Sequence, residues 1–142
     1  MNATDRPQDM FPKAVPDEGS YESPTAPWPT ELRLFKEEAR LEIEFSDGCT
    51  HSLPAEYLRV ESPSAEVQGH GPSQKKIISG RRHVKITAVE PVGNYAIRIV
   101  FDDKHDTGIF SWSYLRELGD TYAERWAAYQ AALLYRGLSR DA

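Results

Sequence analysis

Two histidines, His70 and His105, are the residues of this chain best suited to chemistry. Carboxylates lie near both of them in the sequence, namely Glu66 before His70, and Asp103 and Asp106 on either side of His105. Two imidazoles and a carboxylate can bind iron or zinc while leaving coordination positions open. The sequence alone does not show that the two segments meet. Hydrogen bonding of both histidines to the backbone is therefore the competing interpretation.

Motifs of enzymatic catalysis are missing from the sequence. It contains no Gly-x-Ser-x-Gly, no glycine-rich phosphate loop and no His-Glu-x-x-His. The single cysteine, Cys49, follows an Asp47-Gly48 turn signal and is expected to be a strand residue rather than a nucleophile. His51 and His83 lie in strand-like alternation and are expected at the surface. We therefore predict that the protein is not an enzyme.

Composition excludes several classes of partner. The net charge of −5 gives no general attraction for nucleic acid or anionic lipid, which require clustered basic residues. The one basic cluster, Lys75-Lys76 and Arg81-Arg82-His83, is expected to be a solvated loop. No apolar run approaches the roughly 20 residues that span a bilayer, and the N-terminus lacks the pattern of a secretion signal. We expect a cytoplasmic protein.

The N-terminal segment, residues 1–29, is expected to be a disordered tail. It holds most of the ten prolines, and its few apolar residues follow no period. From Thr30 onward apolar residues alternate, which predicts strands with one buried face. The predicted inward residues of the first two strands are Leu32, Leu34, Leu41, Ile43 and Phe45. A third strand, Cys49 to Leu53, completes an antiparallel meander.

A short helix and a long loop are expected next. Pro54 suits the first turn of a helix that ends at Leu58, and glycines and prolines make 62–80 a long, irregular loop. Two further strands are expected at 84–92 and 95–101, joined by a hairpin turn at Gly93-Asn94. In the first of them Ile86 and Ala88 are expected to point inward.

The last third of the sequence predicts two helices. Ser111 is expected to cap the first helix, and Gly119 is expected to end it in a left-handed conformation. Asp120 or Thr121 is expected to cap the second helix, and Gly137 to end it. The second helix carries Tyr122, Trp126, Tyr129 and Leu133 at helical spacing, as a stripe that covers the core or, if exposed, binds a partner. The expected fold is α+β: a small, mostly antiparallel sheet domain at 30–119 with a short helix and a long central loop, followed by a C-terminal helix and tail at 120–142.

Two blocks of the sequence resemble one known family. Leu58 to Gly71 contains Leu-Arg-x-x-Ser-Pro-Ser-Ala-x-Val, and His105 to Leu115 contains His-x-x-Gly-Ile-aromatic-Ser-aromatic. Both patterns are similar to those of the gamma-butyrobetaine hydroxylase N-terminal-like domain family, over roughly Thr30 to Gly119. In the hydroxylase this domain precedes the oxygenase domain and contributes to assembly, and catalysis belongs to the later domain, which we expect to be lacking here. Related domains also occur attached to iron–sulfur cluster carrier proteins. The resemblance thus implies an accessory role near metal or cluster chemistry.

The resemblance also implies a zinc site in family members that bind metal. Their ligands are three cysteines spaced C-x-C-x-x-C and one later histidine, which suits a tetrahedral zinc site. The matching positions here are Ser62, Ser64, Val67 and His105. Serine hydroxyls are weak ligands and valine offers no ligand atom. We therefore predict that this zinc site is absent, that no cofactor is bound, and that Ser62 and Ser64 hydrogen-bond the loop instead.

The expected function is a non-catalytic interaction module with an unknown protein partner. The alternative is a zinc- or iron-binding protein that uses His70 and His105. A third possibility is a homodimer formed through the C-terminal helix. The expected contact surface is the Ser62 to Gly71 loop together with the Phe110 to Tyr114 segment, although the aromatic residues of that segment could equally be part of the core. The candidate binding residues are Arg59, Ser62, Ser64, Glu66, His70, Phe110, Trp112 and Tyr114.

Overall fold

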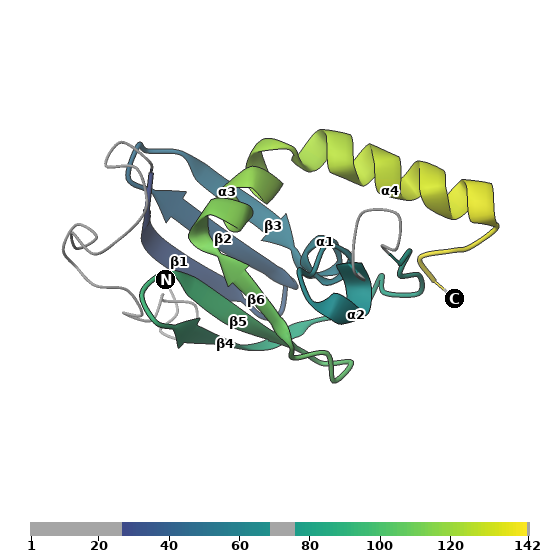
Figure 1. Cartoon of the computed structure of the whole chain (residues 1–142), viewed down its shortest axis with the longest axis horizontal. Coiled ribbons are helices and arrows are strands. Elements are labelled where there is room, and N and C mark those ends of the chain that lie inside the picture. Colours follow the sequence, from purple (N-terminus) through teal and green to yellow (C-terminus); the bar gives the residue numbers. More distant parts are fainter. Residues whose placement is uncertain (1–26, 69–75, 142) are drawn as a thin grey trace.

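The computed structural model of the chain describes residues 27–68 and 76–141. Within these ranges the fold is α+β, with two three-stranded antiparallel sheets and two longer C-terminal helices (Figure 1). Most of the predicted tail, and the part of the central loop that contains His70, lie outside the described residues.

The first sheet is the predicted meander. Its strands are β1 (Pro29–Phe35), β2 (Arg40–Phe45) and β3 (Thr50–Pro54), paired in the order β1-β2-β3. Alternation places Leu32, Ile43 and Leu53 in the core, because every second side chain of a strand points to the same face. At the turn between β2 and β3, Gly48 has a φ of +86° and the backbone N–H of Cys49 donates to Asp47 Oδ1 at 3.2 Å. This turn therefore uses the residues that the sequence indicated.

The second sheet differs from the prediction in three details. It pairs β4 (Ile86–Val92), β5 (Ala96–Phe101) and β6 (Gly108–Ser111) in that order. The register shifts between Ile86 and Ala88, so Val89 rather than Ala88 lies opposite Ile99 and packs against the core. Pairing resumes at Ala96, so the hairpin loop has three residues (93–95) instead of two. Strand β6 was not predicted as a strand.

Within residues 27–68 and 76–141, four helices follow the strands or link them. They are α1 (Ala55–Val60), α2 (Ala65–Gln68), α3 (Trp112–Asp120) and α4 (Tyr122–Arg136). Ser111 caps α3 as expected, since its Oγ accepts from the backbone N–H of Tyr114 at 3.1 Å. Gly137 ends α4 with a φ of 68°, and the N–H of Leu138 donates to Leu133 O at 2.8 Å. The expected left-handed stop at Gly119 is wrong, because α3 continues through Gly119 to Asp120.

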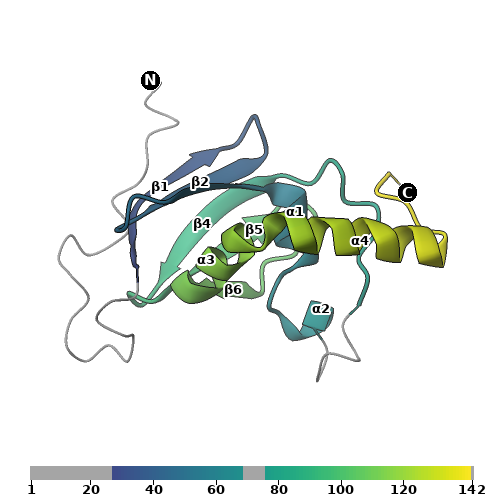
Figure 2. The same cartoon turned by 90° about the horizontal axis from the view of Figure 1, so that it is seen from above.

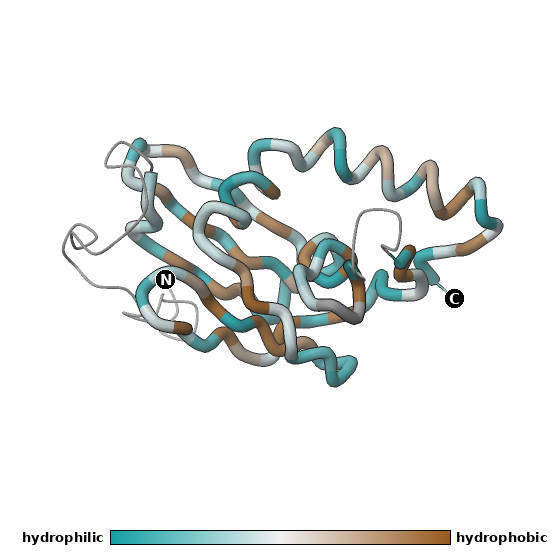
Figure 3. The backbone as a smooth tube through the Cα atoms, in the orientation of Figure 1, coloured by the Kyte–Doolittle hydropathy of each residue, from teal (hydrophilic) through white to brown (hydrophobic). Residues whose placement is uncertain are grey.

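The helices and the two sheets enclose one main hydrophobic core. Buried side chains of both sheets, α1 and α3 form a single cluster, with Tyr57 and Phe110 among its largest members. Helices α3 and α4 follow one another along the same side of the molecule (Figure 2). Apolar and polar residues alternate along the strands, and apolar residues also recur between polar ones along α4 (Figure 3). Tyr129 and Leu133 of α4 pack with Val60 in a second, smaller cluster.

Charged pairs connect the C-terminal part to α1. Arg140 forms hydrogen bonds of 2.8 and 2.7 Å with the two carboxylate oxygens of the buried Glu56. Arg125 lies 3.2 Å from a carboxylate oxygen of the buried Glu61. Among the helices of the described ranges, none is both long enough and apolar enough to cross a bilayer.

Candidate functional sites

Ser62, Ser64 and His105 meet in the interior, although some 40 residues separate the serines from the histidine. His105 Nε2 lies 2.9 Å from Ser62 Oγ and 3.4 Å from Ser64 Oγ, and the two hydroxyl oxygens are 3.4 Å apart. All three residues are buried. A Cβ at Gly108 would lie only 2.4 Å from Ser62 Oγ, so glycine at the start of β6 makes room for the hydroxyl. We call Ser62, Ser64 and His105 the serine–histidine cluster.

A partly buried charge network, in which only Arg59 is fully enclosed, borders the serine–histidine cluster. Asp103 Oδ2 accepts from Arg59 Nε at 2.8 Å and from Arg81 Nε at 2.7 Å, and Asp103 Oδ1 accepts from the backbone N–H of His105 at 3.2 Å. Burial alone would raise the pKa of Asp103, but these hydrogen bonds and the two guanidinium charges together hold it below the usual value. Arg59 Nη1 is buried and has no hydrogen-bond partner among the described residues.

The aromatic candidates are largely internal. Phe110 is fully buried and belongs to the core, so it offers no surface to a partner. Trp112 and Tyr114 are partly buried against the same core. Their polar ends are used inside the molecule: Trp112 Nε1 donates to Asn94 O at 3.0 Å, and Tyr114 Oη donates to Glu61 O at 2.6 Å.

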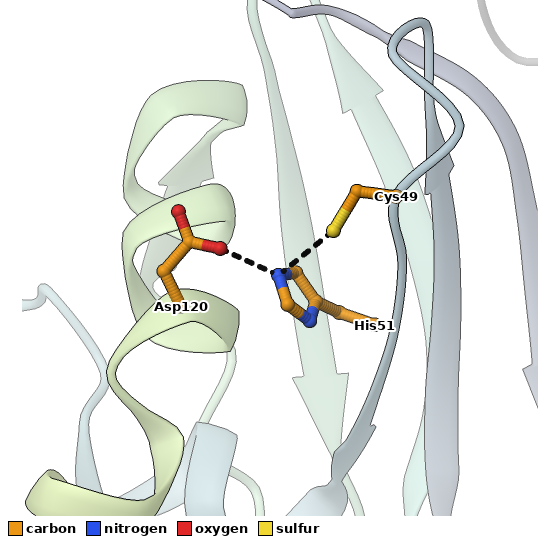
Figure 4. A group of neighbouring side chains, drawn as sticks. All are labelled: Cys49, His51 and Asp120. Carbon is orange, nitrogen blue, oxygen red and sulfur yellow. Dashed lines mark hydrogen bonds and ion pairs between the residues drawn. The ribbon is translucent and has the colours of Figure 1, made fainter.

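A second group of side chains, Cys49, His51 and Asp120, lies at the junction of the first sheet and α3 (Figure 4). His51 Nε2 is 3.5 Å from Cys49 Sγ and 2.8 Å from Asp120 Oδ1. One ligand atom from each of the three residues lies within 4.8 Å of the others. We call these residues the thiol–imidazole–carboxylate cluster.

Local structure explains how this second cluster forms. Cys49 and His51 are two residues apart in an extended segment, so their side chains project to the same face. Helix α3 packs over β3 and carries Asp120 at its end. A Cβ at Gly119 would lie 2.1 Å from His51 Cδ2, so the imidazole packs directly against the helix backbone. His51, expected at the surface, is therefore partly buried, whereas His83 is exposed.

Arg116 sets the electrostatics of the second cluster. Its Nε lies 3.1 Å from both carboxylate oxygens of Asp120, and its Nη2 lies 2.9 Å from Asp47 Oδ2. Burial would raise the pKa of Asp120, but hydrogen bonds from His51 and Arg116 and the Arg116 charge lower it overall. The pKa of Asp47 is lowered chiefly by its hydrogen bond to Arg116, and the pKa of Arg116 is raised by the same bond.

Comparison with known proteins identifies the family. A family model described as gamma-butyrobetaine hydroxylase-like, N-terminal, matches residues 32–116, more than half of the chain. The chain belongs to this family. No curated protein matches the sequence.

Solved structures with about 40% sequence identity are similar to this chain. One NMR solution structure is 43% identical, covers 81% of this chain and 90% of its own, and has a TM-score of 0.72. Another NMR solution structure is 42% identical, and its match covers 86% of this chain and 91% of the other chain. Its TM-score is also 0.72. The third is a crystal structure of a protein of unknown function from Acidithiobacillus ferrooxidans, assigned to the DUF971 family. It is 40% identical, the match covers 65% of this chain and 92% of the other chain, and the TM-score is 0.56.

The serine–histidine cluster occupies the positions at which the family resemblance implies a zinc site. Its donor set does not fit that ion, because it offers one imidazole, two neutral hydroxyls and, at the buried Val67, no ligand atom. The alternative pair, His70 and His105, is not addressed by the structure, because His70 and the side chain of Glu66 lie outside what is described.

Sequence reasoning missed the thiol–imidazole–carboxylate cluster. The signal that was available is Cys-x-His at strand spacing, and Asp120 joins it only through the tertiary fold. The cluster is not arranged like a catalytic triad. In a triad the nucleophile and the acid contact different ring nitrogens, whereas here Cys49 and Asp120 both face Nε2 of His51.

Proposed function

We propose that this member of the gamma-butyrobetaine hydroxylase-like N-terminal family is a non-catalytic interaction module that binds a protein partner through the end of α4. One observation carries the proposal. Leu134 and Tyr135 are 83% and 91% exposed, and Leu138 beyond the helix end is also exposed. Exposed apolar groups of this kind mark interaction surfaces, and tyrosine is enriched among residues that dominate binding energy. We call Leu134, Tyr135 and Leu138 the α4 tip.

The position of the α4 tip supports this role. Tyr129 and Leu133 of the same helix are buried against the domain, so the helix is fixed while its outer residues stay in solvent. Helix α4 projects past the sheets toward the C-terminal end (Figure 1). A rigid helix that presents apolar side chains orders few groups on binding, which lowers the entropic cost of association.

The family suggests the setting in which such a partner is found. In the hydroxylase that the family resembles, this domain precedes the oxygenase domain, and related domains occur attached to iron–sulfur cluster carrier proteins. We therefore propose that the partner is a protein of metal-enzyme or iron–sulfur assembly. The net charge of −5 favours a protein surface over nucleic acid or anionic lipid.

Site-specific photo-crosslinking tests the proposal. A benzophenone amino acid replaces Tyr135 in one variant and Gln130, an exposed polar residue of the same helix, in the control. In cells that produce the protein, we expect a discrete adduct from position 135 and none from position 130. Mass spectrometry then identifies the partner.

The outcomes separate the alternatives. An adduct with a metal-enzyme or cluster-assembly protein supports the full proposal. An adduct of twice the chain's mass would make a second copy the partner and contradict the assembly role. Equal adduct patterns from both positions would show that the α4 tip is not a specific docking surface. A Tyr135→Asp variant with unchanged thermal stability should lose the specific adduct when the crosslinker is placed at Leu134.

A further inference from the structure

We propose that Cys49, His51 and Asp120 form a binding site for one zinc-like divalent transition-metal ion, separate from the serine–histidine cluster. The ion would be held by Cys49 Sγ, His51 Nε2 and Asp120 Oδ1, with water in a fourth position. Thiolate, imidazole and carboxylate are all established zinc ligands, and three protein ligands with one open position is a common arrangement.

Two of the three ligand-to-ligand distances in the cluster can be compared with those of such a site, and the third, between Cys49 and Asp120, is no longer than 4.8 Å. Bond lengths of about 2.3 Å to sulfur and about 2.0–2.1 Å to nitrogen give a tetrahedral edge of about 3.5 Å. The separation of Cys49 Sγ and His51 Nε2 is 3.5 Å. Nitrogen and oxygen ligands are about 3.4 Å apart in the same geometry. His51 Nε2 and Asp120 Oδ1 are 2.8 Å apart, so Asp120 must move outward slightly. Its side chain is about half exposed, which leaves room for that movement.

The orientation of His51 favours a metal ion over a proton. Figure 4 shows that Nε2 faces both the sulfur of Cys49 and the carboxylate of Asp120. A proton on Nε2 serves only one of these two neighbours well, because a single N–H points in one direction. A metal ion bonded to Nε2 lies within reach of both. A thiolate ligand also selects zinc-like ions over magnesium or calcium, which prefer oxygen.

The imidazole is held in place before any ligand arrives. The ring of His51 packs against the backbone of α3 at Gly119, where a Cβ would overlap it. It also meets the ring of Phe45 edge-on, at a centroid distance of 6.3 Å. Glycine inside a helix is destabilising relative to alanine, so its presence at this position preserves space for the ring. Cys49 is positioned by the turn in which its N–H donates to Asp47.

Charges around the cluster fit a dication. Asp47 and Asp120 contribute two negative charges, and Arg116 between them contributes one positive charge. With Cys49 as a thiolate the net charge is −2, which one divalent ion neutralises. Arg116 Nε holds the Asp120 carboxylate, and a carboxylate has lone pairs for both a hydrogen bond and a metal. Hydrogen bonds of this kind commonly orient metal-binding carboxylates.

Cobalt(II) titration of the tag-free, full-length protein tests the site. Cobalt(II) adopts the geometry of zinc, and a cobalt–thiolate bond gives a charge-transfer band in the near ultraviolet. We expect this band to saturate at one equivalent and to disappear when zinc is added. Competition with a chromophoric chelator then gives the zinc affinity of each variant.

Three variants and a control decide the result. We expect Cys49→Ser to abolish the charge-transfer band, and His51→Gln and Asp120→Asn to weaken zinc binding at least tenfold. His83→Gln changes an exposed histidine outside the cluster and should leave binding unchanged. Circular dichroism confirms that each variant is folded. The proposal is overturned if the wild type gives no band, if Cys49→Ser retains it, or if His83→Gln weakens binding as much as His51→Gln.

Discussion

At the scale of single residues, Gly119 offers a sharp test of side-chain packing. Alanine inside a helix is normally more stable than glycine by about 1 kcal/mol. Here its Cβ would overlap His51, so we expect Gly119→Ala to lower the free energy of unfolding by about 1–3 kcal/mol, as overpacking does. Urea unfolding measures the change. In a His51→Ala background the same substitution should become stabilising. Stabilisation in the wild type would show that the ring does not occupy this space.

Asp103 is the residue on which the partly buried charge network depends. Removal of its carboxylate leaves the buried Arg59 without its ionic partner. We expect Asp103→Ala to cost about 2–3 kcal/mol, because the buried Arg59 charge loses its partner although the Asp103 side chain itself is 21% exposed. Arg81→Ala should cost about 1 kcal/mol or less, because the Arg81 side chain is more exposed. Chemical denaturation at neutral pH checks both values, and equal costs would contradict this role for Arg59.

The pKa of Asp103 adds a pH dependence to the same test. The pKa is lowered in the folded state, so the unfolded chain takes up a proton first as the pH falls. The stabilisation is therefore fully present above about pH 4, the ordinary aspartate value, and is lost as the pH falls toward the lower folded value. Unfolding curves at a series of acidic pH values should show this loss in the wild type and a shallower one in Asp103→Ala.

At the scale of elements, the cap of α3 can be tested directly. Ser111 Oγ accepts from the Tyr114 N–H, and loss of such a cap costs about 1 kcal/mol. We expect Ser111→Ala to lower the free energy of unfolding by this amount. Ser111→Asp should retain most of the stability, because aspartate caps helices as well as serine does. Similar losses in both variants would point to a steric effect instead of the cap.

Local patterns predicted the long elements well and the irregular ones poorly. Alternation indicated β1, β2 and β3, because each has one buried face. The inward side of β4 was misplaced after Ile86, because a register shift changes the alternation without any signal in side-chain type. Strand β6 has only four residues and leads directly into α3, too few to show a period. Gly119 was misinterpreted because its role depends on His51, a contact between distant segments.

At the scale of the whole molecule, the two clusters show what tertiary structure adds. Ser62, Ser64 and His105 were grouped only through the family resemblance, which pairs two distant blocks, and the fold places them in contact. Cys49 and His51 had no such guide. Their third partner, Asp120, is 69 residues from His51 and arrives with α3. Residue types and short spacings cannot encode that meeting, because it depends on how α3 packs over β3.

Two tyrosines link distant parts of the molecule, and alkaline pH should weaken both links. Tyr114 Oη donates to Glu61 O at the end of α1, and Tyr129 Oη donates to Ile78 O beyond the central loop. Burial raises the pKa of each to about 12, and the charges of Glu61 near Tyr114 and Glu56 near Tyr129 add to the effect. The ordinary tyrosine value is about 10.

The sign of the effect follows from these pKa values. Between about pH 10 and the folded value the unfolded chain releases protons that the folded protein retains, so the free energy of unfolding falls as the pH rises. Below about pH 10 the contribution is complete, because tyrosine is protonated in both states. Urea unfolding at increasing pH should show this fall, and it should be shallower in Tyr114→Phe and Tyr129→Phe. If the free energy of unfolding of both variants falls as steeply with pH as that of the wild type, these phenols do not resist ionisation in the folded protein. Other groups then cause the loss of stability at alkaline pH.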